Sequence, residues 1–107
     1  MRIALHQVVQ ELTAGLKSLY GPRFRGLVLY GSYARGDADE GSDVDLLLLL
    51  QGPVQAEQEI LRIEPFKWPL GLSTGLTLSI LPVDAEAYEN GESLFLRQAR
   101  RDGVLAA

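Results

Sequence analysis

Residues 28–50 read VLYGSYARGDADEGSDVDLLLLL, and the fold and the candidate site both follow from this stretch. The apolar segment Leu27–Tyr30 predicts a short buried strand that runs directly into Gly31-Ser32. After ten intervening residues, Asp43 and Asp45 stand at the head of five consecutive leucines. Those leucines predict a second strand, Val44–Leu50, that is covered on both faces for most of its length.

Asp43 and Asp45 lie one residue apart on the second strand, so their side chains point to the same face. Two adjacent carboxylates repel each other when both are ionised, and a divalent cation removes that repulsion. Mg²⁺ prefers one or two carboxylates together with phosphate oxygens of a substrate. Two such ions, roughly 3.5–4 Å apart, stabilise the attacking and leaving oxygens of a phosphoryl-type displacement. We therefore expect a magnesium site at Asp43 and Asp45, with two ions possible.

Gly31 and Ser32 predict a phosphate-binding turn at the end of the first strand. A glycine lets the backbone approach a phosphate closely. Ser32 adds a hydroxyl and a backbone N–H at the expected start of a helical turn, where anions are favoured. Arg35 lies three residues further on and would supply positive charge to a triphosphate. The stretch thus predicts a site for a metal-bound nucleoside triphosphate, either ATP or another NTP.

Outward from this stretch, the pattern predicts one domain over residues 1–107, of class α/β (α+β), with a small mixed sheet backed by helices. The connection between the first two strands has no crossover helix, so we expect these strands to be antiparallel neighbours. Pro65 is expected to end a helix and Pro82 to close a third strand. The other expected elements are helices over 3–20 and 54–64, a Pro- and Gly-rich loop over 65–75, a strand over 76–81, helical turns at 33–36 and 84–88, and a last helix from Ser93 to near Gly103.

The composition limits the classes of partner. The net charge is −4, and phosphate backbones need a basic face, so a long nucleic acid is not expected as a partner. The chain has no cysteine, which excludes thiolate metal sites and cysteine nucleophiles. The longest apolar run, Leu46–Leu50, is too short to span a bilayer. A cytoplasmic protein with no membrane association is therefore expected, and its oligomeric state is left open.

The spacing from Gly31-Ser32 to Asp43-Val44-Asp45 resembles the signature of the DNA polymerase β-type nucleotidyltransferase superfamily, and most closely its minimal nucleotidyltransferases. The segments YGSYARG, SDVDLLLLL and ESLFLRQARRDGV are also similar to that group. The resemblance implies transfer of a nucleoside monophosphate to a hydroxyl group with release of pyrophosphate, with Asp43 and Asp45 as catalytic residues. Several relatives are antitoxins paired with an all-helical HEPN toxin, which some of them AMPylate on tyrosine.

The chain departs from the family pattern at the third carboxylate. Active members usually carry another acid on the following strand, beside the first two. Here alternation along Leu76–Leu81 places Thr77 and Ser79 on the expected face, and neither is acidic. Asp84 follows Pro82 and is expected to be a helix N-cap, while Asp37, Asp39 and Glu40 are expected in a solvated loop.

Two functional hypotheses follow from these residues. The first is a nucleotidyltransferase that moves AMP from ATP, with Mg²⁺, to a hydroxyl on a HEPN-type partner toxin. The second is a nucleotidyltransferase-fold binding module of weak or no activity that neutralises its partner by forming a complex. The absence of a third acid at Thr77 and Ser79 motivates the second hypothesis, since losing a general base commonly costs about 10²–10⁴-fold in rate.

Overall fold

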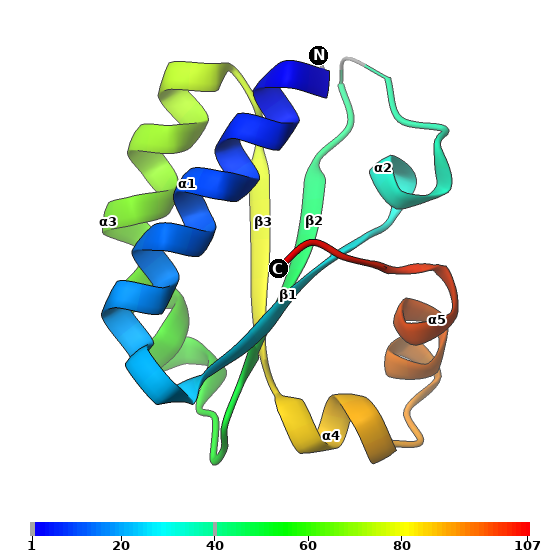
Figure 1. Ribbon diagram of the computed structural model, residues 1–107. Helices are drawn as coiled ribbons and strands as arrows, with labels where there is room; N and C mark the ends of the chain where they lie inside the picture. The colour runs from blue at the N-terminus through cyan, green and yellow to red at the C-terminus, as the bar shows by residue number, and fades with distance from the viewer. Residues whose placement is uncertain (1, 40) are drawn as a thin grey trace.

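The computed structural model describes residues 2–39 and 41–107, and it has the expected small mixed sheet backed by helices (Figure 1). The strands are β1 (Phe24–Tyr30), β2 (Val44–Leu50), β3 (Leu78–Asp84) and β4 (Val104–Leu105). The helices are α1 (Arg2–Tyr20), α2 (Ser32–Arg35), α3 (Ala56–Thr74), α4 (Ala85–Asn90) and α5 (Leu94–Asp102), with a 3-10 turn η1 (Gly21–Arg23). Within the described part of the chain, no helix is both long and apolar enough to cross a membrane.

The four strands lie side by side in the order β3-β2-β1-β4. β1 is antiparallel to β2, as expected from the short connection between them, while β2 and β3 are parallel. The two-residue strand β4 pairs antiparallel with β1 at Val28 and Leu29. The sequence does not predict β4, because a two-residue strand is too short to show a period-two pattern.

The leucines of β2 are buried on both faces of the sheet, as the unbroken run predicts. Leu46, Leu48 and Leu50 belong to a core that includes buried side chains of α1 and α3. Leu47 and Leu49 belong to a smaller core on the other face, formed with Val28, Ala99 of α5 and partly buried residues of α4. By alternation Asp45 shares this second face. In Figure 1, α1 and α3 lie together on the left, and α2 and α5 lie on the right.

Two expectations about proline were wrong. Pro65 does not end a helix, because α3 continues to Thr74 with Pro65 and Pro69 inside it, so residues 65–74 are helical rather than a loop. Both prolines lie on the exposed face of α3, where water can bond the carbonyls that they free. Ile63 is buried, and Phe66 packs close to Gly15 of α1 on the opposite face. These tertiary contacts offset the local preference to stop.

The third strand is also displaced from its predicted position. It begins at Leu78 rather than Leu76 and passes through Pro82 to Asp84. β3 is an edge strand, and Pro82 pairs with Leu48 in the register. The Thr77 carbonyl accepts a hydrogen bond from the Val44 N–H, so by alternation the Pro82 nitrogen faces away from β2. The strand therefore loses no ladder hydrogen bond at Pro82.

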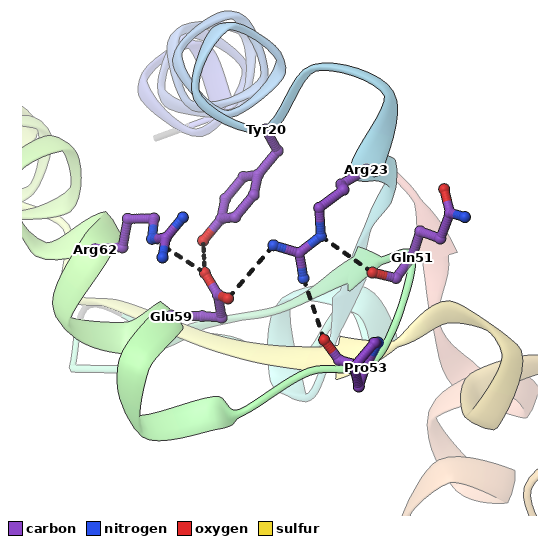
Figure 2. A network of polar contacts seen from close by, with 6 residues as sticks. All are labelled: Tyr20, Arg23, Gln51, Pro53, Glu59 and Arg62. Carbon is purple, nitrogen blue, oxygen red and sulfur yellow. Dashed lines mark hydrogen bonds and ion pairs between the residues drawn. The ribbon is translucent and has the colours of Figure 1, made fainter.

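A polar network joins α1, η1 and α3 at the lower end of the sheet (Figure 2). Glu59 is only 4% exposed and accepts a hydrogen bond of 2.6 Å from the Tyr20 hydroxyl. Arg23 and Arg62 form ion pairs with the same carboxylate at 3.6 and 3.5 Å. Arg23 also donates to the carbonyls of Gln51 and Pro53. Glu59 thereby holds the start of α3 against the end of α1 and the loop after β2.

Candidate nucleotidyl-transfer site

The two aspartates lie where β2 begins, on the sheet face that α4 and α5 cover only in part. Asp45 is half-buried and stands between Tyr30 of β1 and Ser79 of β3 in the strand register. Asp43 is exposed and immediately precedes β2. Asp43 is two residues from Asp45, and its charge acts on the Asp45 carboxyl, so the two carboxylates lie near each other.

Gly31 brings the Gly-Ser turn against the aspartate pair. Its backbone angles are φ 75° and ψ −156°, a combination open almost only to glycine. A Cβ atom at this position would lie 2.3 Å from Oδ2 of Asp45. Ser32, which begins α2, follows directly and is half-buried. The fold thus places Gly31 and Asp45 in contact, which the sequence spacing alone suggested but could not show.

Burial and neighbouring charge both act on the aspartate pair. Burial, and next the neighbouring charge of Asp43, raise the pKa of the Asp45 carboxyl above its usual range, while Arg35 opposes the shift. Burial, and next the charge of Asp45, likewise raise the pKa of Tyr30. A bound cation would relieve both effects, because it would offset the charge that Asp43 and Asp45 concentrate here.

Arg35 is exposed at the end of α2 and forms an ion pair of 3.4 Å with Asp37. The pair is exposed at both ends, so it holds Arg35 only weakly. Arg35 also lines a pocket together with Tyr30 and Gly31. Its charge acts on Asp45, so it lies near the aspartates, and its role as a counter-charge for phosphate stays a prediction.

The third carboxylate of the family pattern has no counterpart among the residues that the structure describes. Ser79 stands beside Asp45 and Thr77 beside the start of β2, and both are exposed, as the sequence analysis expected. No cluster of three potential metal ligands occurs in residues 2–39 and 41–107. The place of a third acid is therefore taken by two hydroxyl side chains.

The other acids lie away from this position. Asp84 pairs with Leu50 at the opposite end of β3, roughly 16 Å from Ser79 at about 3.3 Å per residue. It caps α4 by accepting from the Glu86 N–H, as expected, so it cannot act as a base at Asp45. Asp39 accepts from the Gly41 N–H within the acidic loop. Glu40 lies outside the described residues.

The structure adds residues that the sequence analysis did not assign to the site. Tyr30 is the cross-strand neighbour of Asp45, and Phe95, Gln98 and Asp102 of α5 line the same pocket as Gly31. These α5 residues lie in the family-like segment ESLFLRQARRDGV, but the segment alone gives them no role, because only the packing of α5 on the sheet brings them within reach of Gly31.

The chain is similar to known proteins in sequence and in fold. A family model described as "Nucleotidyltransferase domain" matches residues 9–90. The chain is 44% identical over 43 residues to the putative protein adenylyltransferase MJ0604 of Methanocaldococcus jannaschii, which covers 40% of this chain and 43% of that protein. It is 34% identical over 59 residues to the putative protein adenylyltransferase MJ0141 of the same organism, covering 53% and 60%. The chain thus spans less than two thirds of either relative.

Solved structures share the fold at low identity. One is a chain of a crystal structure of a "toxin-antitoxin with AMP-PNP", with a TM-score of 0.57, 15% identity, and coverage of 90% of this chain and 70% of that chain. Another is a putative nucleotidyltransferase from Sulfolobus solfataricus, with a TM-score of 0.51, 20% identity, and coverage of 98% and 78%. Because the family model matches well over half of its length, the chain belongs to the nucleotidyltransferase domain family.

Proposed function

We propose that this domain transfers the nucleoside monophosphate of ATP, or of another nucleoside triphosphate, to a hydroxyl group of a partner protein. The acceptor oxygen bonds to the α-phosphorus, the bond from that phosphorus to the oxygen shared with the β-phosphate breaks, and pyrophosphate leaves. The observation that carries the proposal is the contact between Gly31 and Asp45, which sets a Gly-Ser turn beside an aspartate pair on one open sheet face.

Asp43 and Asp45 are the residues that would hold magnesium. Carboxylate oxygens suit this ion. Burial contributes most to the raised pKa of Asp45, and a cation would offset the second contribution, which is the neighbouring charge of Asp43. The bound ion would neutralise charge that develops on the transferred phosphoryl group. Gly31, Ser32 and Arg35 would hold the β- and γ-phosphates on the β1 side of the aspartates.

The strand order suggests the direction from which the acceptor approaches. In an in-line displacement the attacking oxygen lies opposite the leaving group. With pyrophosphate on the β1 side, the acceptor hydroxyl would approach over β3, where Thr77 and Ser79 are exposed. These hydroxyls supply no carboxylate base, so the acceptor proton would pass to solvent or to a base on the partner protein.

We further propose that the partner is a HEPN-type toxin and that a tyrosine hydroxyl is the acceptor. Two observations support this choice. The fold is similar to that of a chain crystallised in a toxin–antitoxin complex, and two sequence relatives carry the name of protein adenylyltransferases. AMP from ATP is accordingly the transferred group that we expect.

The proposal is tested by incubating the chain with Mg²⁺, the product of the adjacent gene, and ATP labelled at either the α- or the γ-phosphate. The partner should gain the α-label and not the γ-label. Asp45→Asn should reduce labelling by at least about 10²-fold, because it removes one of the two carboxylates. Glu89→Gln removes an acid from α4, away from the site, and should leave labelling unchanged.

The second candidate, a binding module without turnover, is favoured by the hydroxyl side chains at the third-acid position. Under this candidate the partner binds tightly and is inhibited, but it gains no label from either form of ATP. An unlabelled and inhibited partner would therefore reject the transfer reaction and support the binding module.

A further inference from the structure

A pocket of about 210 Å³ lies between the end of β1 and α5, beside the proposed phosphate-binding residues Gly31, Ser32 and Arg35. One wall consists of Tyr30, Gly31 and Arg35, and the other consists mainly of Phe95, Gln98 and Asp102. Gly31 contacts Asp45, and Tyr30 pairs with Asp45 across the strands. The pocket therefore shares Tyr30 and Gly31 with the surroundings of the aspartate pair.

The two walls differ in charge, and this difference sets the orientation of a bound nucleotide. Arg35 offers positive charge on the α2 side, whereas Asp102 offers negative charge on the α5 side. The side chain of Asp102 meets Arg101 only at 4.0 Å, and both side chains are well exposed, so its charge is weakly compensated. Phosphates are repelled from the α5 wall, while an uncharged base and the hydroxyls of a ribose are not.

The two aromatic side chains of the pocket contact each other. Tyr30 and Phe95 meet edge to face, with ring centroids 5.5 Å apart and an angle of 83° between the ring planes. Phe95 nevertheless remains 45% exposed, so part of its ring is open to a ligand. A planar base that stacks on this ring would bury it at little cost in side-chain entropy.

Gln98 and the size of the pocket limit further which ligand the pocket can bind. The amide of Gln98 offers one donor group and one acceptor, the pair that adenine takes through N7 and its exocyclic amine. Pockets that enclose a whole drug-sized ligand measure roughly 300–1,000 Å³, so about 210 Å³ suits a part of a nucleotide rather than all of it.

We infer that this pocket binds the nucleoside of the triphosphate, with the base against Phe95, its edge at Gln98 and the ribose hydroxyls toward Asp102. The inference rests on the proposed function. It makes α5, which carries no sequence motif for nucleotides, the element that selects the base. Arg35 and the Gly-Ser turn then serve the phosphates alone.

The test separates nucleoside binding from phosphate binding by titrating the chain calorimetrically with ATP and with inorganic triphosphate, both with Mg²⁺. Phe95→Ala should weaken ATP binding by roughly 10- to 100-fold, the range of lost base stacking, and should leave triphosphate binding unchanged. Arg35→Ala should weaken both ligands. Leu94→Ala, which alters a neighbouring side chain of α5 that is 74% exposed and does not line the pocket, should affect neither.

Gln98→Ala provides a second variant, because Gln98 is exposed and its truncation leaves the core of α5 intact. It should lower the ratio of ATP affinity to GTP affinity by roughly tenfold. If Phe95→Ala and Gln98→Ala both bind ATP as the wild type does, the nucleoside lies elsewhere and the inference is overturned, while the proposed function stands. If the wild type binds neither ATP nor triphosphate, the proposed function fails as well.

Discussion

Gly31 and Gly36 flank the short helix α2, and they differ in what a side chain would meet. Both have positive φ, 75° and 83°. A Cβ on Gly31 would collide with Oδ2 of Asp45 at 2.3 Å, whereas a Cβ on Gly36 would have no neighbouring atom within 4 Å. The two positions therefore allow backbone strain to be separated from displacement of the Asp45 carboxylate.

Gly31→Ala should cost about 1–3 kcal/mol of unfolding free energy from strain and should also lower affinity for Mg²⁺–ATP by at least about tenfold, because the Asp45 side chain must move. Gly36→Ala should show a loss of stability of similar kind but keep nucleotide affinity near that of the wild type. Urea unfolding and calorimetric titration measure the two quantities. Equal nucleotide affinity in both variants would mean that Gly31 does not position Asp45.

At the scale of elements, the network around Glu59 couples α1 to α3. Burial, and next the hydrogen bond to Glu59 and its negative charge, raise the pKa of the Tyr20 phenol above its ordinary value of 10.0. Above pH 10 the unfolded chain releases this proton while the folded chain keeps it. The stability that Tyr20 contributes is therefore complete below pH 10 and declines as the pH rises further.

Tyr20→Phe should destabilise the fold by about 1–3 kcal/mol at pH 8, because the buried carboxylate of Glu59 loses its phenol donor (Figure 2). Raising the pH to 10.5 should narrow the difference, since only the wild type carries the titrating phenol. Urea unfolding of the wild type and of Tyr20→Phe at pH 8 and pH 10.5 measures this difference in stability. A difference that stays constant would show that Tyr20 is not coupled to Glu59 in this way.

In α3, tertiary packing outweighs the local preference of proline to end a helix. Pro65 and Pro69 predict a loop, and each costs several kcal/mol inside an isolated helix. Ile63 and Phe66, one on either side of Pro65, pack into the α1–α3 interface, and the prolines face solvent. Burial on one face of α3 outweighs the lost hydrogen bonds on the other, and this balance depends on contacts with residues some fifty positions away.

At the scale of the whole molecule, the two faces of the sheet are covered unequally. The face under α1 and α3 carries a large core that includes Leu12, Leu16, Leu48 and Ile63. The face under α4 and α5 carries a small one, in which Ala99 is the only residue of α5 that is fully buried. Opening α5 therefore exposes less apolar surface than opening α1 or α3, and it requires less free energy.

Amide hydrogen exchange should show this difference directly. Amides of α5 should exchange through a local opening, with protection at least about tenfold lower than that of β2, which opens only with the whole domain. Saturating Mg²⁺–ATP should raise protection in α5 more than in α3, because the inferred nucleoside pocket uses α5. Equal protection in α5 and β2 without ligand would contradict the unequal division of the core.

Part of the fold and the family could be predicted from patterns among residues close together in the sequence. The spacing of Gly31-Ser32 and Asp43-x-Asp45, the five leucines and the helical periodicity of the first twenty residues depend on neighbours in sequence, and they correctly predicted the strand Val44–Leu50, the antiparallel pair and the family. Other features depend on atoms that the chain brings together only when it folds. Among these are the proline-containing α3, the passage of β3 through Pro82, the contact of Gly31 with Asp45, and the approach of α5 to the Gly-Ser turn. Contacts between residues far apart in the sequence decide them, and such contacts leave no local pattern.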